Sequence, residues 1–343
     1  GRQSADTMAG TSTAAIIVGG RTPSALNNVE QYDGTAWSIG RKHPVKNTAG
    51  ATLGSQNSAM TAGGRTPTYH NAAFVNTCSI YCGGTWSVGS SLNTSRIHLG
   101  GGGTQNAALA FGGATPSYQS ATEEYNGSTW STLNTLNSAR GNASSNGTAT
   151  AAVYAGGGPG KKTDSEDWDG SSWSTGNTLI FGRRRITGLG ATGTQSAGLA
   201  WAGYAPPTSP SNFVNCVEEY DGSSWSAGGA LITKNSKPGG AGTQNAAISM
   251  GGQTPSGIAD NVEFYNGSSW ASGTSIITGR STGVGSGTQN AAFLAGGLGD
   301  SDYSFADTEE YNGITFNIVG SLPTILIGSA GAGASSADSM TFG

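Results

Sequence analysis

Residues 103–113 are Gly-Thr-Gln-Asn-Ala-Ala-Leu-Ala-Phe-Gly-Gly, and residues 122–130 are Thr-Glu-Glu-Tyr-Asn-Gly-Ser-Thr-Trp. The apolar run in the first stretch does not alternate with polar residues, which is typical of a short strand that is buried on both faces. In the second stretch, Asn-Gly separates a tyrosine segment from a tryptophan segment. This dipeptide is a strong hairpin signal and predicts a type I′ turn, in which both central residues have positive φ.

Both stretches recur seven times along the chain. Each apolar run ends in a pair of small residues, and the second members of successive pairs are 44 to 49 residues apart. The pairs are Gly19-Gly20, Gly63-Gly64, Gly112-Gly113, Gly156-Gly157, Ala202-Gly203, Gly251-Gly252 and Gly296-Gly297. The aromatic residues that follow the hairpin turns are Trp37, Trp86, Trp130, Trp173, Trp225, Trp270 and Phe316. Repetition at a fixed period decides the architecture before any other signal.

Each repeat predicts four strands: a Gly-rich strand, the apolar run, the Glu-Tyr segment and the Trp segment. Four strands in about 46 residues, repeated around an axis, are the signature of a β-propeller. Small inner strands suit a crowded central channel, and the larger Tyr and Trp side chains fill the wider gaps between blades. We therefore expect the tryptophans to be mostly buried between neighbouring blades, and the small pairs to occupy equivalent places.

We expect one all-β propeller domain over residues 1–343. The repeats span approximately residues 1–42, 43–92, 93–136, 137–179, 180–231, 232–276 and 277–322. Residues 323–343 match the first two strands of a further unit. Seven blades with an extra C-terminal hairpin is the favoured prediction, and eight blades is the alternative. Gly1 is not an initiator Met and no secretory signal is evident, so we expect a processed chain or a part of a longer one.

Composition excludes several classes of protein. The chain has 58 Gly in 343 residues, only 10 % of its residues are charged, and its net charge is −4. The glycines do not fall at every third position, which excludes collagen, and no apolar run approaches the roughly 18 residues of a membrane span. Apart from Arg183-Arg184-Arg185 there is no basic stripe, so neither nucleic-acid binding nor membrane insertion is expected. A surface of Gly, Ser, Thr and Asn suits an extracellular or particle-borne protein.

The three cysteines do not form a disulfide framework. Cys78 and Cys82 lie in one predicted strand, about 13 Å apart at ~3.3 Å per residue, which exceeds the roughly 7 Å limit for a disulfide. We expect these two thiols and Cys216 to be free and to behave as small hydrophobic groups.

The chain resembles kelch-repeat propellers in its Gly-Gly after the second strand, its Tyr in the third and its Trp in the fourth. The wording Gly-Thr-Gln-Asn-Ala-Ala, followed by Glu-Glu-Tyr-Asn-Gly and Trp, is similar to repeat arrays encoded by bacteriophages of aquatic bacteria. The resemblance covers nearly the whole chain and implies a virion-associated protein of tail or fibre type. Galactose oxidase shares the kelch propeller, but no motif for its copper ligands is present, and its activity is not carried over.

Variable loops predict the binding face. Connections between second and third strands, and between blades, share one face and vary in length, whereas the opposite face has uniform tight turns. Binding residues are commonly found on variable loops of a rigid scaffold, and aromatic loop residues suit sugar or protein recognition. The candidate ligand-binding residues are Tyr69, His70, Phe74, Tyr118, Tyr204, Phe213 and Tyr303. The alternative is that these aromatic side chains cap the ends of the blades.

No catalytic residue, cofactor or metal is predicted. A glutamate recurs in most blades, at Glu30, Glu123, Glu218, Glu263 and Glu309. A residue that recurs once per blade cannot mark a single active site, and we expect it to pair with an arginine or with backbone donors. The histidines at 43, 70 and 98 lie in different segments, which disfavours a shared metal. Asp300, Asp302 and Asp307 are better interpreted as a solvated acidic loop than as a calcium site.

The sequence therefore predicts a non-enzymatic propeller on the virion surface, an adhesin that recognises a host-surface glycan or envelope protein. The alternative is a structural or decoration protein that contacts other virion proteins. Self-association into a homo-oligomer is compatible with both functions.

Overall fold

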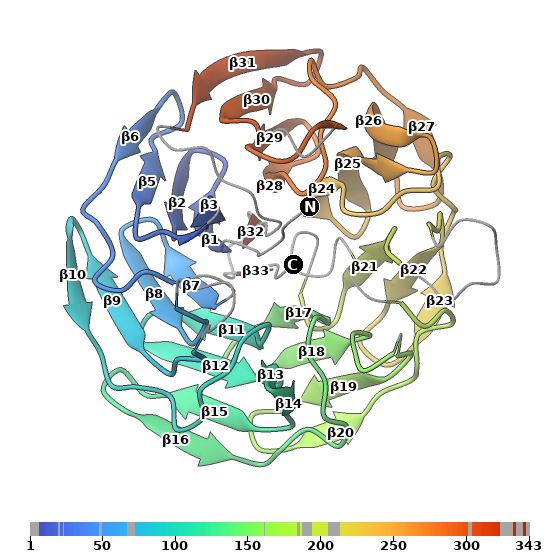
Figure 1. Cartoon of the computed structure of the whole chain (residues 1–343). Helices are drawn as coiled ribbons and strands as arrows, with labels where there is room; N and C mark the ends of the chain where they lie inside the picture. Colours follow the sequence, from blue (N-terminus) through green and yellow to red (C-terminus); the bar gives the residue numbers. More distant parts are fainter. Residues whose placement is uncertain are drawn as a thin grey trace.

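The computed structural model describes residues 7–19, 21–22, 24–47, 50–66, 73–160, 162–183, 186, 194–204, 213–300, 304–322, 332–333 and 339–340. This part of the chain is all-β and contains no α-helix. Seven antiparallel sheets surround a central axis as the blades of a propeller (Figure 1). The seven-bladed prediction is confirmed, and the eight-bladed alternative is wrong, because the seventh blade packs directly against the first.

The strands of each blade follow one another from the axis outward. Blade 1 consists of β1 (Thr7–Thr11), β2 (Ala14–Val18), β5 (Val29–Tyr32) and β6 (Trp37–Ile39). Blade 2 consists of β7 (Ala51–Ser55), β8 (Ser58–Ala62), β9 (Cys78–Cys82) and β10 (Thr85–Val88). Blade 3 consists of β11 (Gly100–Thr104), β12 (Ala107–Phe111), β15 (Thr122–Tyr125) and β16 (Trp130–Leu133). Blades 4 and 5 consist of β17 (Ser144–Gly147), β18 (Ala152–Ala155), β19 (Ser165–Trp168) and β20 (Trp173–Thr175); and β21 (Gly198–Trp201), β22 (Val217–Tyr220) and β23 (Trp225–Ala227). The Gly-rich strand predicted at residues 187–191 of blade 5 lies outside the described residues.

Blades 6 and 7 complete the ring. They consist of β24 (Gly239–Thr243), β25 (Ala246–Thr254), β26 (Gly257–Tyr265) and β27 (Trp270–Ser272); and β28 (Val284–Thr288), β29 (Ala291–Ala295), β30 (Asp307–Tyr311) and β31 (Phe316–Ser321). Two short hairpins, β3 (Arg21–Thr22) with β4 (Ser24–Ala25) and β13 (Ala114–Thr115) with β14 (Ser117–Tyr118), extend the connections of blades 1 and 3.

The extra C-terminal hairpin lies at the centre of the ring. It consists of β32 (Ala332–Gly333) and β33 (Ser339–Met340), which pair with each other, and β32 also pairs in parallel with β28 at Gly287 and Gly333. β33 lies close to β11 and β17, the inner strands of blades 3 and 4 (Figure 1). The hairpin therefore occupies the channel and adds no eighth blade.

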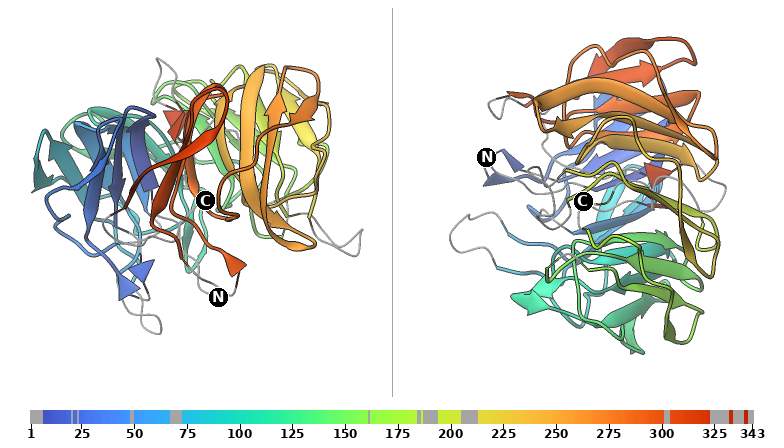
Figure 2. Two further views of the ribbon diagram at one scale, coloured as in Figure 1. Left: turned by 90° about the horizontal axis from the view of Figure 1, so that it is seen from above. Right: turned by 90° about the vertical axis from the view of Figure 1, so that its right-hand side faces the viewer.

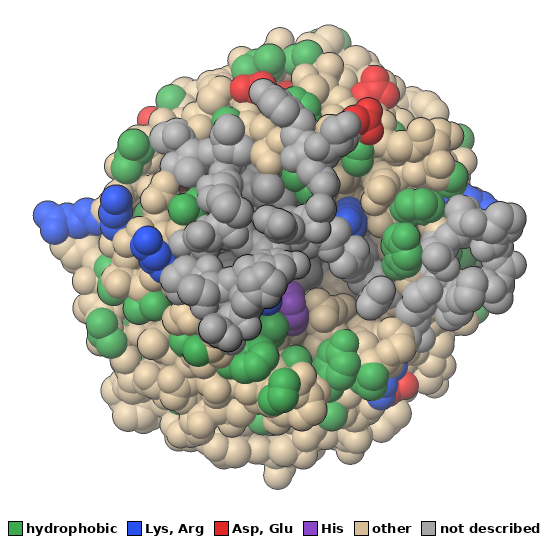
Figure 3. Space-filling model, viewed as in Figure 1, with side chains coloured by type: hydrophobic (Ala, Val, Ile, Leu, Met, Phe, Trp, Pro, Cys, Tyr) green, Lys and Arg blue, Asp and Glu red, His purple; other side chains and the backbone are tan. Residues whose placement is uncertain are grey.

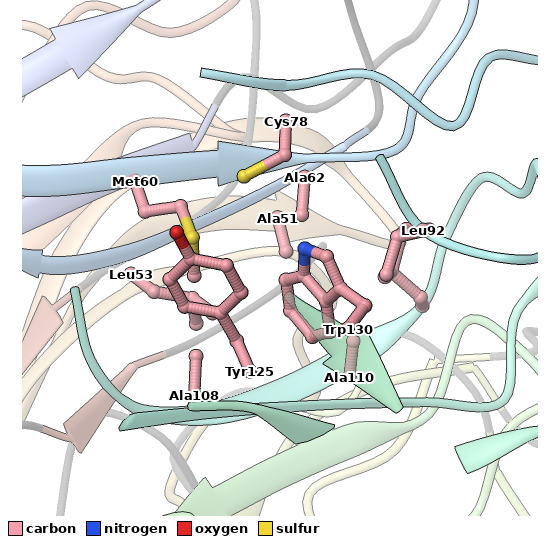
Figure 4. Close-up of a cluster of buried hydrophobic side chains, with 11 residues drawn as sticks. Ala51, Leu53, Met60, Ala62, Cys78, Leu92, Ala108, Ala110, Tyr125 and Trp130 are labelled. Atoms are coloured by element: carbon pink, nitrogen blue, oxygen red, sulfur yellow. The ribbon is translucent and has the colours of Figure 1, made fainter. Parts of the chain in front are cut away.

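Hydrophobic clusters between neighbouring blades form the core. In one of them, Leu53, Met60 and Cys78 of blade 2 face Tyr125 and Trp130 of blade 3, and the small residues Ala51, Ala62, Ala108 and Ala110 let the sheets approach (Figure 4). Burial of apolar surface contributes roughly 25 cal/mol per Å². Because each sheet covers the faces of its two neighbours, no blade buries its own surface alone.

The fourth-strand aromatic of each blade reaches back to the preceding blade. The indole Nε1 of Trp173 donates to Thr122 Oγ1 at 2.8 Å, and Trp37 Nε1 donates to Thr308 Oγ1 at 2.8 Å. The second of these bonds joins blade 1 to blade 7 and so closes the ring. The predicted burial between blades is confirmed for Trp37, Trp130, Trp173, Trp225 and Trp270, which are 6–8 % exposed.

Trp86 is an exception, because it is only partly buried. A leucine or isoleucine of the connection lies against the equivalent aromatic in other clusters, as Leu92 lies beside Trp130. In blade 2 this place is taken by His43, whose ring packs edge-on against Trp86 at a centroid distance of 4.8 Å. Trp86 thus lies between blades 1 and 2 as predicted, but it is less buried than the other five tryptophans.

The repeated glutamine joins neighbouring blades through the backbone. Gln105 Nε2 donates to the carbonyl oxygens of Ala59 and Tyr81, which belong to the second and third strands of the preceding blade. Gln56, Gln195, Gln244 and Gln289 make the corresponding pair of bonds. The Gly-Thr-Gln motif was visible in the sequence, but its bonding role depends on which blades are adjacent.

The repeated glutamate forms a buried ion pair with an arginine from the connection that enters the same blade. The pairs are Arg96–Glu123 (2.9 Å), Arg140–Glu166, Arg183–Glu218 (2.8 Å) and Arg280–Glu309. Glu263 instead accepts the backbone N–H groups of Ile232 and Thr233. Pairing with an arginine or backbone donors is thus confirmed for Glu123, Glu218, Glu263 and Glu309. In blade 2, Asn47 and Ser79 stand at the arginine and glutamate positions, whereas blade 6 has Asn235 at the arginine position and keeps Glu263.

The small pairs occupy equivalent places at the ends of the second strands. Their first members have φ between +56° and +79° in all seven blades, and six of the seven are glycine. At Gly112 a Cβ would stand 2.6 Å from the carbonyl oxygen of Arg140, so both backbone conformation and space require glycine. Blade 5 departs from this pattern, because Ala202 adopts φ +56° while fully buried.

Replacing Trp130 tests the contact between blades. Trp130→Ala should lower the free energy of unfolding by about 3–5 kcal/mol, since it leaves a cavity between β9 and β15. The matched variant Trp86→Ala should cost clearly less, because this side chain already contacts solvent. Urea unfolding of both variants measures the difference, and an unchanged stability for Trp130→Ala would contradict the blade assignment.

A double-mutant cycle tests the buried ion pair. Arg96→Asn removes the buried cation beside Glu123 and leaves its carboxylate with the N–H groups of Asn93 and Thr94, as in blade 6, so it should cost up to about 3–5 kcal/mol. Adding Glu123→Ser reproduces the Asn and Ser combination of blade 2. The double variant should therefore lose less free energy of unfolding than the two single variants lose together. Additive losses in urea unfolding would show that the two side chains do not act as a pair.

Candidate functional site

The propeller has two unlike faces. Connections between second and third strands, and connections between blades, emerge together on what we call the loop face. The turns between first and second strands and between third and fourth strands form the turn face. The β3–β4 and β13–β14 hairpins extend from the same side of the ring (Figure 2).

The turn face is uniform and is stabilised by acidic and amide side chains. Oδ1 of Asp33 accepts the N–H groups of Thr35 and Ala36 at 2.9 Å and the Thr35 hydroxyl at 2.7 Å. Equivalent bonds are made by Asn126, Asp169, Asp221, Asn266 and Asn312. Hydrogen bonds from Thr35 and Ala36 lower the pKa of Asp33 to about 2. These carboxylates are therefore occupied in holding the turns.

The predicted type I′ turns are wrong in their backbone conformation. The glycine after the Asp or Asn has φ close to +92°, as at Gly34 and Gly127, but no Asp or Asn of these turns has positive φ. Positive φ at the first central residue alone is the pattern of a type II′ turn. The Asp or Asn precedes the two central residues, because its side chain accepts the N–H groups that close the turn.

The loop face differs from blade to blade. Blade 3 carries the β13–β14 hairpin, whereas blade 6 continues β25 and β26 beyond the sheet until they meet at Thr254 and Gly257. In blade 5, single backbone bridges join Tyr204 to Phe213 and Val214 to Asn235. The scaffold is constant while these connections vary, as expected for a recognition surface.

Tyr204 and Phe213 are brought together at the base of the blade 5 connection. Their rings are 5.4 Å apart at an interplanar angle of 69°, an edge-on arrangement, and both side chains are partly exposed. Edge-on aromatic pairs gain roughly 0.5–1.5 kcal/mol beyond area burial. The pair therefore fixes the ends of the connection while leaving ring surface accessible.

The other candidates are placed separately. Tyr118, at the end of β14, lies next to Gly158 of blade 4, where an added Cβ would stand 2.4 Å from its hydroxyl oxygen. Phe74 is partly exposed beside the bridge from Arg65 in blade 2. Tyr69, His70 and Tyr303 lie outside the described residues. Blades 2 and 5, which carry Phe74 and Tyr204, stand on opposite sides of the ring (Figure 1).

Few charges mark the described part of the loop face. Figure 3 shows hydrophobic side chains scattered among polar uncharged ones around the centre of the ring. Phe305 lies over the Arg280 guanidinium, with 4.9 Å between its ring centroid and the guanidinium carbon. This aromatic ring contacts the scaffold and caps a blade end, as the alternative interpretation expected for loop aromatics.

A set of left-handed residues stands two positions before the inner strands β11, β17, β24 and β28, and the sequence did not reveal it. His98, Asn142, Lys237 and Thr282 each stand two residues beyond the Arg or Asn of a connection, with φ between +52° and +57°. The N–H of Asn142 donates to the carbonyl of His98 at 3.2 Å, and the N–H of Thr282 donates to that of Lys237 at 3.0 Å. These bonds join the connections of adjacent blades to each other and so restrict their movement.

The described histidines serve local structure. His43 is buried, and its Nδ1 and Nε2 lie 2.6 Å from Val45 O and 2.8 Å from Thr61 Oγ1. Burial lowers the pKa of His43, against the hydrogen bond to Val45, which raises it. Among the described residues no cluster of His, Cys, Asp and Glu could hold a metal ion. Asp302 and His70 lie outside them. Cys78, Cys82 and Cys216 are free, as predicted.

The comparisons with known proteins support the propeller fold and no finer assignment. No protein-family model matches the sequence, and no curated protein matches it. The chain is similar to the solved structure titled "Structure of YjhT", with a TM-score of 0.56 and 12 % identity over 92 % of this chain and 97 % of that chain. This similarity indicates a common propeller architecture, but at such low identity it implies nothing about a ligand. No helix able to span a membrane occurs among the described residues.

The buried His43 predicts a pH dependence of stability. Its pKa is lower in the folded protein than the roughly 6.5 of an exposed histidine, so the unfolded chain takes up a proton first as the pH falls. Stability should be fully present above about pH 6.5 and should decline below it, by up to about 1.4 kcal/mol per pH unit. Thermal melting of the native chain and of His43→Leu, which introduces the residue other blades use, measures this slope. An equal slope in both proteins would assign the effect to other groups.

Proposed function

We propose that this protein is a non-enzymatic recognition module of a virion, of tail or fibre type, whose loop face binds a glycan or an envelope protein on the host surface. The observation that carries the proposal is the contrast between a repeated scaffold and non-repeated, aromatic-bearing connections on one face. Tyr204, Phe213 and Phe74 are partly exposed on that face, whereas the repeated tryptophans and glutamates are engaged between or within blades.

The scaffold supports recognition because it is tied together at several levels. Glutamine bonds, buried ion pairs and indole contacts repeat around the ring, and the left-handed residues join adjacent connections. A fixed platform lowers the entropy lost when loops engage a ligand. Sequence change in the connections can then alter specificity without altering the fold.

The chemistry of the face favours uncharged ligands. Only 10 % of the residues are charged, so electrostatic steering contributes little to encounter. Aromatic rings with neighbouring hydroxyl and amide groups suit stacking and hydrogen bonding to sugars. Binding of this kind should depend only modestly on salt.

The virion assignment rests on the resemblance of the repeat to phage-encoded arrays and kelch propellers. A structural or decoration protein is the alternative, favoured by the near absence of charge over much of the surface. In that case the same face would contact other virion proteins and no host ligand would be required.

Paired substitutions test the loop face. Tyr69→Ala combined with Tyr204→Ala should reduce binding of the isolated chain to host cells or to a glycan array by at least about tenfold, equivalent to about 1.4 kcal/mol. The control is Asp33→Asn on the turn face, which should leave binding unchanged, since Asn126 occupies the same turn position in blade 3.

Thermal melting establishes that the variants are folded. Intact host binding by the folded loop variant would contradict the face assignment. Binding to virion proteins without binding to host cells would favour the structural alternative, and turnover of a host polysaccharide would refute a non-enzymatic function.

A further inference from the structure

Asparagine precedes glycine at four places in the chain, and the structure puts these pairs in two environments. Asn126, Asn266 and Asn312 are exposed and lie in the turns between third and fourth strands, on the turn face. We call these three residues the turn asparagines. Asn146 is 1 % exposed and lies within β17, opposite Val153 of β18. The same dipeptide thus meets water in three blades and is enclosed in a sheet in another.

An asparagine followed by glycine holds an electrophile and a nucleophile in one segment. The backbone nitrogen of the glycine can attack the side-chain Cγ of the asparagine, because glycine has no Cβ to hinder the approach. A new C–N bond closes a succinimide ring, the side-chain amide leaves as ammonia, and this ammonia carries away the proton of the backbone nitrogen. Water then adds to a ring carbonyl, a ring C–N bond breaks, and a carboxylate stands where the amide was.

The turn leaves the reacting groups accessible. Among the described residues, no hydrogen bond uses the N–H of the glycine that follows a turn asparagine. Asn126 Oδ1 accepts the N–H groups of Ser128 and Thr129, both at 3.0 Å. Donors at this oxygen stabilise the negative charge that develops on it when Cγ is attacked. Solvent exposure supplies the water for the second step.

The surroundings of Asn146 oppose the same chemistry. Asn146 and Gly147 pair with Val153 and Ala152 in the ladder between β17 and β18. Closing the succinimide ring would remove this segment from the ladder, and the buried side chain has almost no contact with water. The fold, and not the dipeptide, therefore decides which asparagines can react.

We propose that the turn asparagines are sites of spontaneous deamidation, and that the fold accepts an aspartate product at all three of them. The turns of blades 1, 4 and 5 already carry Asp33, Asp169 and Asp221 at the corresponding position. Conversion would thus make the turns of blades 3, 6 and 7 like those of the other three blades.

The aspartate product keeps the contacts that close the turn. Asp33 Oδ1 accepts the N–H groups of Thr35 and Ala36 at 2.9 Å, as Oδ1 of a turn asparagine accepts the equivalent groups. Bonds to these two residues lower the pKa of Asp33 to about 2, so the product is a carboxylate at neutral pH. A charged acceptor forms stronger hydrogen bonds than an amide oxygen does.

The other product of ring opening does not fit the turn. When the ring opens at the main-chain carbonyl, the backbone runs through Cβ and Cγ, and the resulting isoaspartate adds one atom to the chain. In blade 3, the turn must join Tyr125 to Trp130, which are paired across β15 and β16. We therefore expect aspartate to preserve the hairpin and isoaspartate to destabilise it.

Deamidation changes the charge of the turn face and leaves the loop face as it is. Three conversions would take the net charge from −4 to −7, and every added carboxylate would lie in a turn between third and fourth strands. The proposal does not depend on what the loop face binds, and its test is separate from that of the proposed function.

Incubation of the native chain in mildly alkaline buffer, followed by digestion and mass spectrometry of the peptides, tests the proposal. We expect the turn asparagines to deamidate at least about tenfold faster than Asn146, and faster at higher pH, since the attacking nitrogen must lose its proton. The matched control is the same chain in urea. There Asn146 should react about as fast as the turn asparagines, because all four precede glycine.

The triple variant Asn126→Asp, Asn266→Asp and Asn312→Asp tests the fit of the product. Its melting temperature should equal that of the native chain, whereas chains that contain isoaspartate should melt lower. Stable turn asparagines in the folded protein, or equally fast deamidation of Asn146 there, would overturn the proposed sites. Slow deamidation of Asn146 in urea as well would overturn the role of the fold, and a lower melting temperature of the triple variant would overturn the fit of aspartate.

Discussion

Contact between the fourth-strand aromatic and the preceding blade is the interaction on which the rest of this structure depends. A single blade is a small sheet with two apolar faces, and it has no core of its own. Each sheet gains a core only between neighbours, where the indole rings, the aliphatic second strands and the small inner strands meet. The ring must therefore close, and Trp37 closes it by reaching Thr308 across the gap between first and last blades.

Polar contacts then give the stacked sheets a defined register. Apolar contacts between two sheets would allow one sheet to shift along the other. The Gln side chain, in contrast, must reach two particular carbonyl oxygens, and the buried arginine must reach its glutamate. Since a buried charge without its partner is costly, these contacts exclude alternative packings. The pair is replaceable, because blade 2 has Asn47 and Ser79 at the two positions and blade 6 has Asn235 with Glu263, while both sheets keep their four strands.

The repeated scaffold and the variable connections use largely different residues. The connections between blades supply core residues such as Leu92 and Arg96, so the connections between second and third strands are the ones that can change without loss of the core.

The sequence by itself determined the sevenfold repeat, the strand order, the burial of five of the tryptophans and the pairing of the recurring glutamate with an arginine or backbone donors. These features repeat with a period of 44 to 49 residues, and periodicity within one chain needs no tertiary information. Only the tertiary structure decided that Trp86 is partly exposed beside His43, that the turns are not type I′, and that the C-terminal hairpin enters the channel and adds no eighth blade. Each of these features depends on which groups from different segments come into contact, either across a blade boundary or within a turn. A repeat in the sequence does not specify such contacts.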